Sequence, residues 1–304
     1  MFTVPKIKAP SNYTYNASAN KNEFADASVA SNSLNLHLLD VYKIDDSTVL
    51  GTGSFGSVCE CVHRFNGIKC AVKSIDKKRH TAVWDIKREI NILQSIHHPN
   101  IMKMHDSFEN ESYLYIITEL YTGGDLFDYV VNSINDSGCV PEDDVKSIIK
   151  AVLNSVQYLH NNDIVHRDIK AENLVFANNK VDTKVKLVDF GLSRRHGKND
   201  SKMTTQVGSA YYMSPGILKG SYDRSCDIWA IGVFCYLLLC GYPPFNGDND
   251  YEINTATKNG CIVFERTVWD NLSSDSEHFV RKLVGPDSGR IDTVNGALGH
   301  HWLK

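Results

Sequence analysis

Two short polar turns in the middle of the chain constrain its fold and its chemistry most. The first is His166-Arg-Asp-Ile-Lys-Ala-Glu-Asn-Leu174, and the second, Asp189-Phe-Gly191, follows a short apolar run. Phosphoryl transfer from a nucleotide needs a group that accepts a hydroxyl proton, a cation beside the moving phosphoryl group, and oxygen ligands for a hard metal ion. The two turns carry residue types that meet these needs, namely Asp168, Lys170, Asn173 and Asp189.

These turns match the patterns H-R-D-x-x-x-x-N and D-F-G, so the chain resembles the eukaryotic protein kinases over residues 43–304. Alone, the Arg-Asp pair would be a weak signal, since such a pair after an apolar strand is more often a structural ion pair. The resemblance implies ATP as the phosphoryl donor, Asp168 and Lys170 as catalytic residues, and Asn173 and Asp189 as ligands of Mg²⁺. Lys170 is typical of kinases that act on serine and threonine, which implies protein substrates carrying these residues.

Charge and composition disfavour several other classes of protein. The formal net charge is -4 with acidic and basic residues interspersed, so no polybasic run is available for a nucleic acid or an anionic membrane. The most apolar run, 228–240, is shorter than the roughly 20 residues that cross a bilayer and predicts a buried helix. The cysteines form no C-x-x-C pair, and no histidine cluster at zinc spacing is visible, which favours reduced thiols. We expect a cytoplasmic monomer with no nucleic-acid partner and no membrane segment.

The residue patterns predict an α+β chain with three parts. Residues 1–38 are rich in Ser, Asn and Ala and have no apolar period, so we expect a disordered N-terminal extension. The resemblance implies the two-lobed protein-kinase fold for the rest. Residues 43–119 would form the N-lobe, a small antiparallel sheet with one main helix, and residues 120–304 the larger, mainly helical C-lobe. The paired glycines of Tyr121-Thr-Gly-Gly-Asp125 would mark the hinge.

A glycine-rich segment near the start of the N-lobe matches G-x-G-x-x-G, a pattern shared by kinases and dinucleotide-binding proteins. A dinucleotide-binding unit needs a helix next. Here two β-rich runs, 57–65 and 68–75, follow instead, separated by Asn66-Gly67, which predicts a type I′ hairpin. The glycines then form a β-turn whose backbone can approach phosphates because no Cβ intervenes. The resemblance implies ATP contacts from the whole segment: Gly51, Thr52, Gly53, Ser54, Phe55 and Gly56.

A lysine and a glutamate complete the N-lobe part of the predicted site. Alternation places Ala71 and Lys73 on one face of a strand, in the Ala-Val-Lys order of kinases. Glu89 lies on a helix with an apolar stripe, where a carboxylate needs a partner. The resemblance implies a Lys73–Glu89 ion pair, with Lys73 holding the α- and β-phosphates. The alternatives are a surface lysine on a strand, and a glutamate that bonds its neighbours Arg88 or Lys87.

Further nucleotide contacts follow from the resemblance alone. The β-rich run 113–120 would carry the gatekeeper Thr118, and the backbone beyond it would face adenine. The alternative for each apolar residue named is an ordinary place in the core. The expected contacts are backbone groups of Glu119 and Tyr121 to adenine, Asp125 to the ribose or to a basic substrate residue, and Val58, Ala71 and Val175 around the adenine ring.

The segment after Gly191 is polar with little periodicity, as expected for a mobile activation segment. Its ending, residues 207–215, resembles the substrate-docking loop of kinases, which implies that Ser209 bonds Asp168 and Lys170. The chain departs from the family at Ser214-Pro-Gly216, where kinases carry Ala-Pro-Glu. The missing glutamate normally pairs with an arginine near the C-terminus, here Arg290. This departure motivates an alternative function, a nucleotide-binding pseudokinase that acts as a scaffold.

Three further motifs are Gly208-Ser-Ala-Tyr-Tyr212, Gly241-Tyr-Pro-Pro-Phe245 and Tyr121-Thr-Gly-Gly-Asp-Leu-Phe127. Together they resemble the calmodulin-dependent group, and especially the catalytic domain of calcium-dependent protein kinases. Such kinases carry an autoinhibitory helix and EF-hands after the catalytic domain, and no EF-hand pattern occurs in this sequence. Either the chain is a catalytic fragment or its regulation differs. The resemblance implies a calcium-sensing regulatory module outside this chain as a partner. Glu172 and Asp125, where relatives present carboxylates to arginine, predict basophilic substrates.

Overall fold

The computed structural model describes residues 28–29, 37–53, 56–78, 83–137, 139–178, 184–260, 262–286 and 289–304. The chain divides into two compact units after Leu120, close to the predicted lobe boundary. One exception is His98–Ile101, predicted in the N-lobe, which belongs to the second unit. The reason is backbone bonding, since Leu187 N donates to the Asn100 carbonyl at 2.8 Å.

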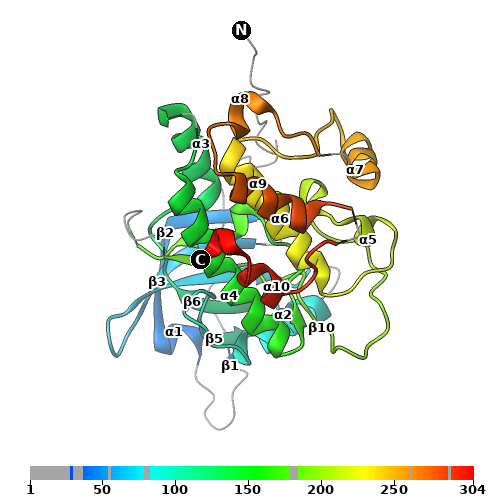
Figure 1. The fold of residues 1–304 in the computed structure, drawn as a ribbon. Helices are drawn as coiled ribbons and strands as arrows, with labels where there is room; N and C mark the ends of the chain where they lie inside the picture. The colour runs from blue at the N-terminus through cyan, green and yellow to red at the C-terminus, as the bar shows by residue number, and fades with distance from the viewer. Residues whose placement is uncertain are drawn as a thin grey trace. The chain divides into compact units, whose positions relative to one another are not determined.

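The first unit is an antiparallel sheet with short helices. Its strand order is β1 (Ser28–Val29), β5 (Met104–Glu109), β6 (Tyr113–Glu119), β4 (Lys69–Asp76), β3 (Gly56–His63) and β2 (Tyr42–Gly53), with helices α1 (Leu38–Val41) and α2 (Val83–Gln94). The sheet is visible in Figure 1.

The predicted disorder of residues 1–38 needs correction at the few of these residues that the structure describes. Ser28 and Val29 pair with Glu109 and Phe108 of β5, which satisfies backbone groups along that edge. Leu38 begins α1 and is fully buried. The remainder of the stretch, apart from His37, lies outside the described residues.

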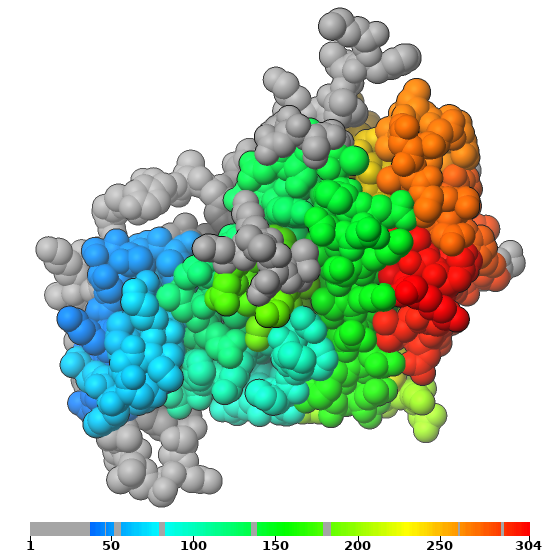
Figure 2. All heavy atoms as spheres, turned by 60° about the vertical axis from the view of Figure 1, so that its left-hand side comes forward, coloured from blue at the N-terminus to red at the C-terminus, as the bar shows by residue number. Residues whose placement is uncertain are grey.

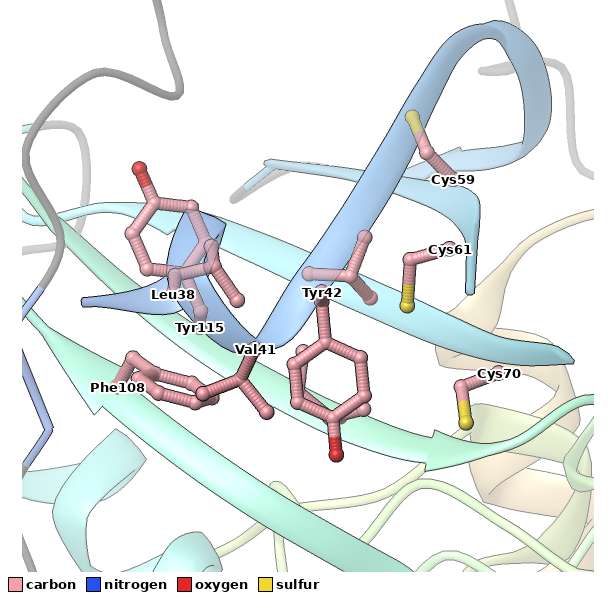
Figure 3. Packing of buried hydrophobic residues seen from close by; sticks show 10 residues of the cluster. Leu38, Val41, Tyr42, Cys59, Cys61, Cys70, Phe108 and Tyr115 are labelled. Atoms are coloured by element: carbon pink, nitrogen blue, oxygen red, sulfur yellow. The ribbon is translucent and has the colours of Figure 1, made fainter. Parts of the chain in front are cut away.

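Strand alternation gives this sheet two different faces. One face packs into an apolar cluster, drawn in Figure 3, in which Tyr42 lies beside thiols from β3 and β4. The opposite face carries Val58, which pairs directly with Lys73, and Ala71, which pairs with Thr118. The buried cluster comprises Leu38, Val41, Tyr42, Cys59, Cys61, Cys70, Val72, Phe108, Tyr115 and Ile117.

The hairpin between β3 and β4 forms, but the predicted type I′ turn is wrong. A type I′ turn needs positive φ at both central residues. Gly67 has φ 71°, whereas Asn66 is absent from the non-glycine residues with positive φ in the described chain. Instead, His63 N donates to the Ile68 carbonyl and Gly67 N to the His63 carbonyl, both at 2.9 Å. The loop is therefore longer, and the Asn66 side chain accepts a bond from Ile68 N.

The second unit is mainly helical and is built around α6 (Ser225–Cys240). All but the first residue of α6 are buried, which confirms the helix predicted from the apolar run. In Figure 1, α6 lies beside α9 (Ser274–Val284), and it also contacts α4 (Glu142–Asn161). The apolar stripe of α4 is wholly buried and comprises Val145, Ile148, Ile149, Val152, Leu153, Val156 and Leu159. The antiparallel sheet unit and this helical unit together confirm the predicted α+β class. None of the described helices is both long and apolar enough to span a membrane.

Shorter elements complete the second unit. Two small antiparallel pairs, β8 (Leu174–Phe176) with β9 (Val185–Leu187) and β7 (Ile164–Val165) with β10 (Arg194–Arg195), carry the catalytic turns at their ends. The other elements are α3 (Leu126–Ser137), α5 (Pro215–Leu218), α7 (Asp250–Asn259), α8 (Arg266–Trp269), α10 (Val294–Leu298), η1 (Ala171–Asn173), η3 (Ala210–Tyr212) and η4 (His301–Leu303).

The C-terminal residues are tied to α4, against which they lie in Figure 2 (red beside green). Gln157 donates to the Asn295 side chain at 2.7 Å. Trp302 Nε1 donates to Glu142 Oε1, also at 2.7 Å, and the Ser273 amide donates to the other oxygen of this carboxylate at 3.0 Å. One acidic residue in the first turn of α4 thus fixes two later segments.

Candidate active site

A buried carboxylate in the first turn of α6 anchors the first catalytic turn. Asp227 is 1% exposed and accepts hydrogen bonds from the backbone amides of His166 at 3.0 Å and Arg167 at 2.8 Å. The His160 ring from α4 lies 2.9 Å from the same carboxylate. Burial alone would raise the pKa of Asp227, but these bonds and the neighbouring histidines outweigh it and hold the pKa below its usual range. The turn can therefore keep Arg167 at φ 70°, an uncommon backbone conformation for a non-glycine residue.

Asp168, the predicted proton acceptor, is held by three side chains. Asn173 Nδ2 donates to Asp168 Oδ2 at 2.9 Å, and Lys170 Nζ lies 3.0 Å from the same oxygen. Ser209 Oγ donates to Asp168 Oδ1 at 3.1 Å and accepts from Lys170 Nζ at 2.8 Å. Both predicted contacts of Ser209 are therefore present. Burial would lower the pKa of Lys170, but Asp168 outweighs it and the pKa is raised, so this ammonium stays charged.

The second catalytic turn places Asp189 two residues after the end of the short strand β9. Its backbone has φ 59°, and its exposed carboxylate accepts a bond from Gly191 N at 3.1 Å. The Val188 amide donates to the Asn173 carbonyl at 2.9 Å, so the two turns are joined. Because the amide nitrogen of Asn173 is bonded to Asp168, its amide oxygen is the atom it can offer to a cation. An amide oxygen and a carboxylate are suitable ligands for Mg²⁺.

In the first unit, Lys73 and Glu89 form the predicted ion pair. Lys73 Nζ lies 3.1 Å from Glu89 Oε1, and the Glu89 side chain is only 5% exposed. The alternative partners for Glu89 are engaged elsewhere, since Arg88 pairs with Asp85 and Lys87 with Glu109. The strand lysine therefore reaches across to the carboxylate on α2, as the kinase resemblance implied.

The glycine-rich segment joins β2 to β3, and Gly51, Thr52 and Gly53 pair with Val58, Ser57 and Gly56. Gly56 is required by the fold itself: a Cβ there would lie 1.7 Å from the Ser74 carbonyl oxygen on β4. Sequence reasoning attributed all three glycines to phosphate approach and missed this contact. The predicted ATP contacts Ser54 and Phe55 lie outside the described residues.

The residues predicted around adenine are divided between the two units. In the first unit, the Glu119 amide donates to the Lys103 carbonyl at 3.0 Å, and the Glu119 carbonyl accepts a bond from Thr118 Oγ1 at 3.2 Å. In the second, half-buried Val175 lies on β8 and forms a backbone bridge with Asp125.

The predicted hinge residues of the second unit also have structural roles. The Asp125 carboxylate accepts from Asp128 N at 2.8 Å at the start of α3. The Tyr121 ring faces Lys186 Nζ at 5.7 Å. A Cβ on Gly123 would lie 2.1 Å from the Asn178 carbonyl oxygen, so the close approach of β8 explains this glycine.

A tyrosine that sequence reasoning missed connects the catalytic turn with the activation segment. Arg167 Nη1 lies 3.1 Å from the Tyr222 hydroxyl, which donates to the Thr205 carbonyl at 2.7 Å. Arg167 Nε donates to the Leu192 carbonyl at 2.7 Å. Thr205 itself is exposed. Tyr222 lies in a short loop without apolar periodicity, so no pattern in the sequence marks it.

Comparison with known proteins places this site in a family. The family model described as Protein kinase domain matches residues 44–303, and the chain belongs to this family. The two-lobed kinase fold implied by the sequence is therefore confirmed.

The chain is also similar to curated calcium-dependent protein kinases. It is 36% identical over 268 residues to calcium-dependent protein kinase 3 of Plasmodium yoelii yoelii, covering 88% of this chain and 49% of that protein. It is 38% identical over 271 residues to calcium-dependent protein kinase 5 of Plasmodium falciparum (isolate 3D7), covering 89% and 46%. The chain thus spans about half the length of the curated relatives it matches.

Proposed function

We propose that this chain is an ATP-dependent protein kinase that transfers the γ-phosphoryl group to serine and threonine hydroxyls. The observation that carries the proposal is the Asp168 carboxylate, held within 3.1 Å by Lys170, Asn173 and Ser209 in a chain of the protein kinase family. A carboxylate fixed in this way is suited to orient a substrate hydroxyl and accept its proton, while the Lys170 ammonium balances charge on the transferring group.

The remaining roles concern nucleotide and metal. Lys73 would hold the α- and β-phosphates, and its ion pair with buried Glu89 fixes the ammonium in one place. Asn173 and Asp189 would hold Mg²⁺, which supplies charge neutralisation at the phosphates when bound. The backbone of Gly51 to Gly56 and the residues predicted around adenine would contact the rest of ATP.

Two acidic residues support a finer proposal, a preference for substrates with arginine before the phosphorylated residue. Glu172 on η1 is an exposed residue, and Asp125 is half-buried. Arginine binds such planar carboxylates through two parallel hydrogen bonds. A peptide array tests this directly: arginine upstream of the phosphorylated residue should raise turnover, and Glu172→Gln should reduce the gain. An array in which upstream arginine is neutral at every position would reject the preference.

Phosphate incorporation into a library of Ser- and Thr-containing peptides tests the kinase activity. We expect turnover by the wild-type chain, and a loss of several orders of magnitude in Asp168→Asn and in Lys73→Met. The reason is that positioning and charge stabilisation carry most of phosphoryl-transfer catalysis. Either variant keeping more than about a tenth of the wild-type kcat, roughly 1.4 kcal/mol in barrier, would reject the assigned role. ATP binding by a wild-type chain without any turnover would instead favour the pseudokinase scaffold.

A further inference from the structure

Three histidine side chains meet near the C-terminus of the second unit, in a place that the kinase reaction does not use. His278 lies on α9, His300 is the residue before η4, and His301 begins it. One metal-ligating nitrogen from each ring lies within 4.8 Å of the others. The nearest pair is His278 Nδ1 and His300 Nε2, 2.8 Å apart. Sequence reasoning found no zinc spacing because only the fold brings His278 to the other two.

A carboxylate beside the cluster is the second observation. Asp275 Oδ1 lies 2.9 Å from His301 Nε2. In metal sites, a ligating histidine almost always gives its other ring nitrogen to a carboxylate, a carbonyl or water, which fixes the tautomer and the orientation of the ring. The contact with Asp275 would leave Nδ1 of His301 as its ligand atom.

The surroundings of His300 keep its ring neutral, the form in which imidazole binds metals. His300 is 8% exposed. Burial, followed by the charges of the neighbouring His301 and His278, lowers the pKa of His300 to about 4. Its Nδ1 accepts a hydrogen bond from Trp302 N at 3.2 Å, so the ring proton sits on Nε2 and bridges to His278.

We propose that His278, His300 and His301 bind a divalent transition metal ion of the Zn²⁺ type. Three neutral imidazoles suit this class of ion, and the fourth tetrahedral position would be open to water. The ion takes the place of the proton that lies between His278 Nδ1 and His300 Nε2. The single proton of neutral His300 moves from Nε2 to Nδ1 by exchange with water, so no net proton is released, and His300 gives up its bond from the Trp302 amide for the metal bond.

The expected consequence is a clamp between α9 and the C-terminal residues. Trp302, next to two of the ligands, bonds Glu142 on α4. A metal ion at the cluster would therefore add a cross-link between α9 and the C-terminal residues. This cross-link would stand beside the one that Trp302 makes with α4. Because the ion binds the folded chain, its binding should raise the melting midpoint.

Titration of the whole chain with Zn²⁺ tests the proposal. The protein is stripped with a chelator and kept in excess Mg²⁺, which occupies carboxylate sites, with a reductant that contains no thiol. We expect one equivalent to bind and the melting midpoint to rise. His278→Gln and His301→Gln should each weaken binding at least tenfold, and Asp275→Asn by about 10–100-fold. His97→Gln is the matched control, an exposed histidine outside the cluster, and should bind like the wild type.

Equal Zn²⁺ affinity in the wild type, His278→Gln and His301→Gln would overturn the proposal, as would a wild-type chain that binds no Zn²⁺. X-ray absorption on the wild-type complex gives an answer that does not depend on how the variants fold. A first shell of nitrogen and oxygen with imidazole scattering is expected. A shell containing sulfur would show that cysteines bind the ion and would reject the histidine site.

Discussion

Asp227 and Trp229 lie two residues apart on the first turns of α6, and their surroundings differ sharply. The Asp227 carboxylate is enclosed by two backbone amides and the His160 ring. The Trp229 ring is also buried, stacked on Phe245 with 5.7 Å between centroids, but its indole N–H has no hydrogen-bond partner among the described residues. The Arg290 guanidinium lies 5.5 Å from the centre of this ring.

The difference shows which part of the family pattern this chain preserves. The Asp227 side holds the catalytic turn through specific hydrogen bonds, and that turn, from His166 to Asn173, matches the kinase pattern. The Trp229 side adjoins Arg290, whose expected partner is absent because Gly216 replaces glutamate. Arg290 is half-buried and faces an aromatic ring, so its guanidinium is not a fully buried charge without a contact. Contacts between a cation and an aromatic face are worth about 0.5–1 kcal/mol where water has access.

The comparison predicts unequal effects of substitution at the two residues. Asp227→Ala should lower the free energy of unfolding by about 3–5 kcal/mol, because it leaves His160 and two buried amides without their acceptor. Trp229→Phe keeps an aromatic ring and removes no observed hydrogen bond, so we expect a loss below about 1.5 kcal/mol. Urea unfolding of both variants measures the difference. Equal losses would show that the Asp227 network does not carry this stability.

The stability difference between wild type and Asp227→Ala should also depend on pH. The folded-state pKa of Asp227 lies below its usual value, so the carboxylate stabilises the fold above its unfolded-state pKa of about 3.9. This contribution should disappear as pH falls through the folded-state pKa. The urea midpoints of the wild type and Asp227→Ala, measured from pH 7 to pH 3, should converge below about pH 4. The gap between wild type and Trp229→Phe should stay constant, and a constant gap for Asp227→Ala would contradict the assigned ionisation.

The catalytic turns could be predicted from the sequence because their chemistry depends on local spacing. Asp168, Lys170 and Asn173 lie on one turn, so their mutual contacts follow from a few residues. The Lys73–Glu89 pair was predictable only through the resemblance to kinases, since strand alternation and helix periodicity place each side chain without naming its partner.

Features that depend on distant segments could not be predicted in the same way. Gly56 is required by the approach of β4, and Tyr222 connects Arg167 to Thr205 through a loop. The histidine cluster joins α9 to the C-terminal turn. In each case the constraint comes from packing between segments, which the sequence pattern does not reveal even where a motif is present, as at Gly56.

Thr205 is connected to the catalytic turn that Asp227 holds, because Tyr222 bonds both the Thr205 carbonyl and Arg167. By resemblance to calmodulin-dependent kinases we expect it to be phosphorylated, because a phosphate there could pair with Arg167 and order the activation segment. Thr205→Ala should lower kcat several-fold without changing the melting midpoint. Mass spectrometry of active protein checks the site, with Thr204→Ala as the matched control. Fully active protein with Thr205 unmodified would end this hypothesis.

The smallest effect is expected at Gly216. From the family pattern alone, Gly216→Glu would be expected to raise stability by about 1–2 kcal/mol through an ion pair with Arg290. The structure lowers this expectation. A Cβ at Gly216 would lie 3.1 Å from Tyr222 Cβ and 3.2 Å from the Ser221 carbonyl oxygen, so these neighbours must shift. Replacing a glycine in a helix raises the free energy of unfolding by up to about 1 kcal/mol, and this gain offsets the crowding. A pair with half-buried Arg290 adds no more than about 1 kcal/mol.

Gly216→Ala separates the two contributions, because it introduces the same Cβ without the carboxylate. We expect the melting midpoint of Gly216→Ala to stay close to that of the wild type and that of Gly216→Glu to lie slightly above it. Adding Arg290→Ala should remove the difference between the Glu and Ala variants, since the coupling is a property of the pair. A difference that persists without Arg290 would show that the carboxylate acts elsewhere. A gain of several kcal/mol in Gly216→Glu would show that the Trp229 side still has the pocket for this ion pair, and the contrast with Asp227 would then reflect only the missing side chain.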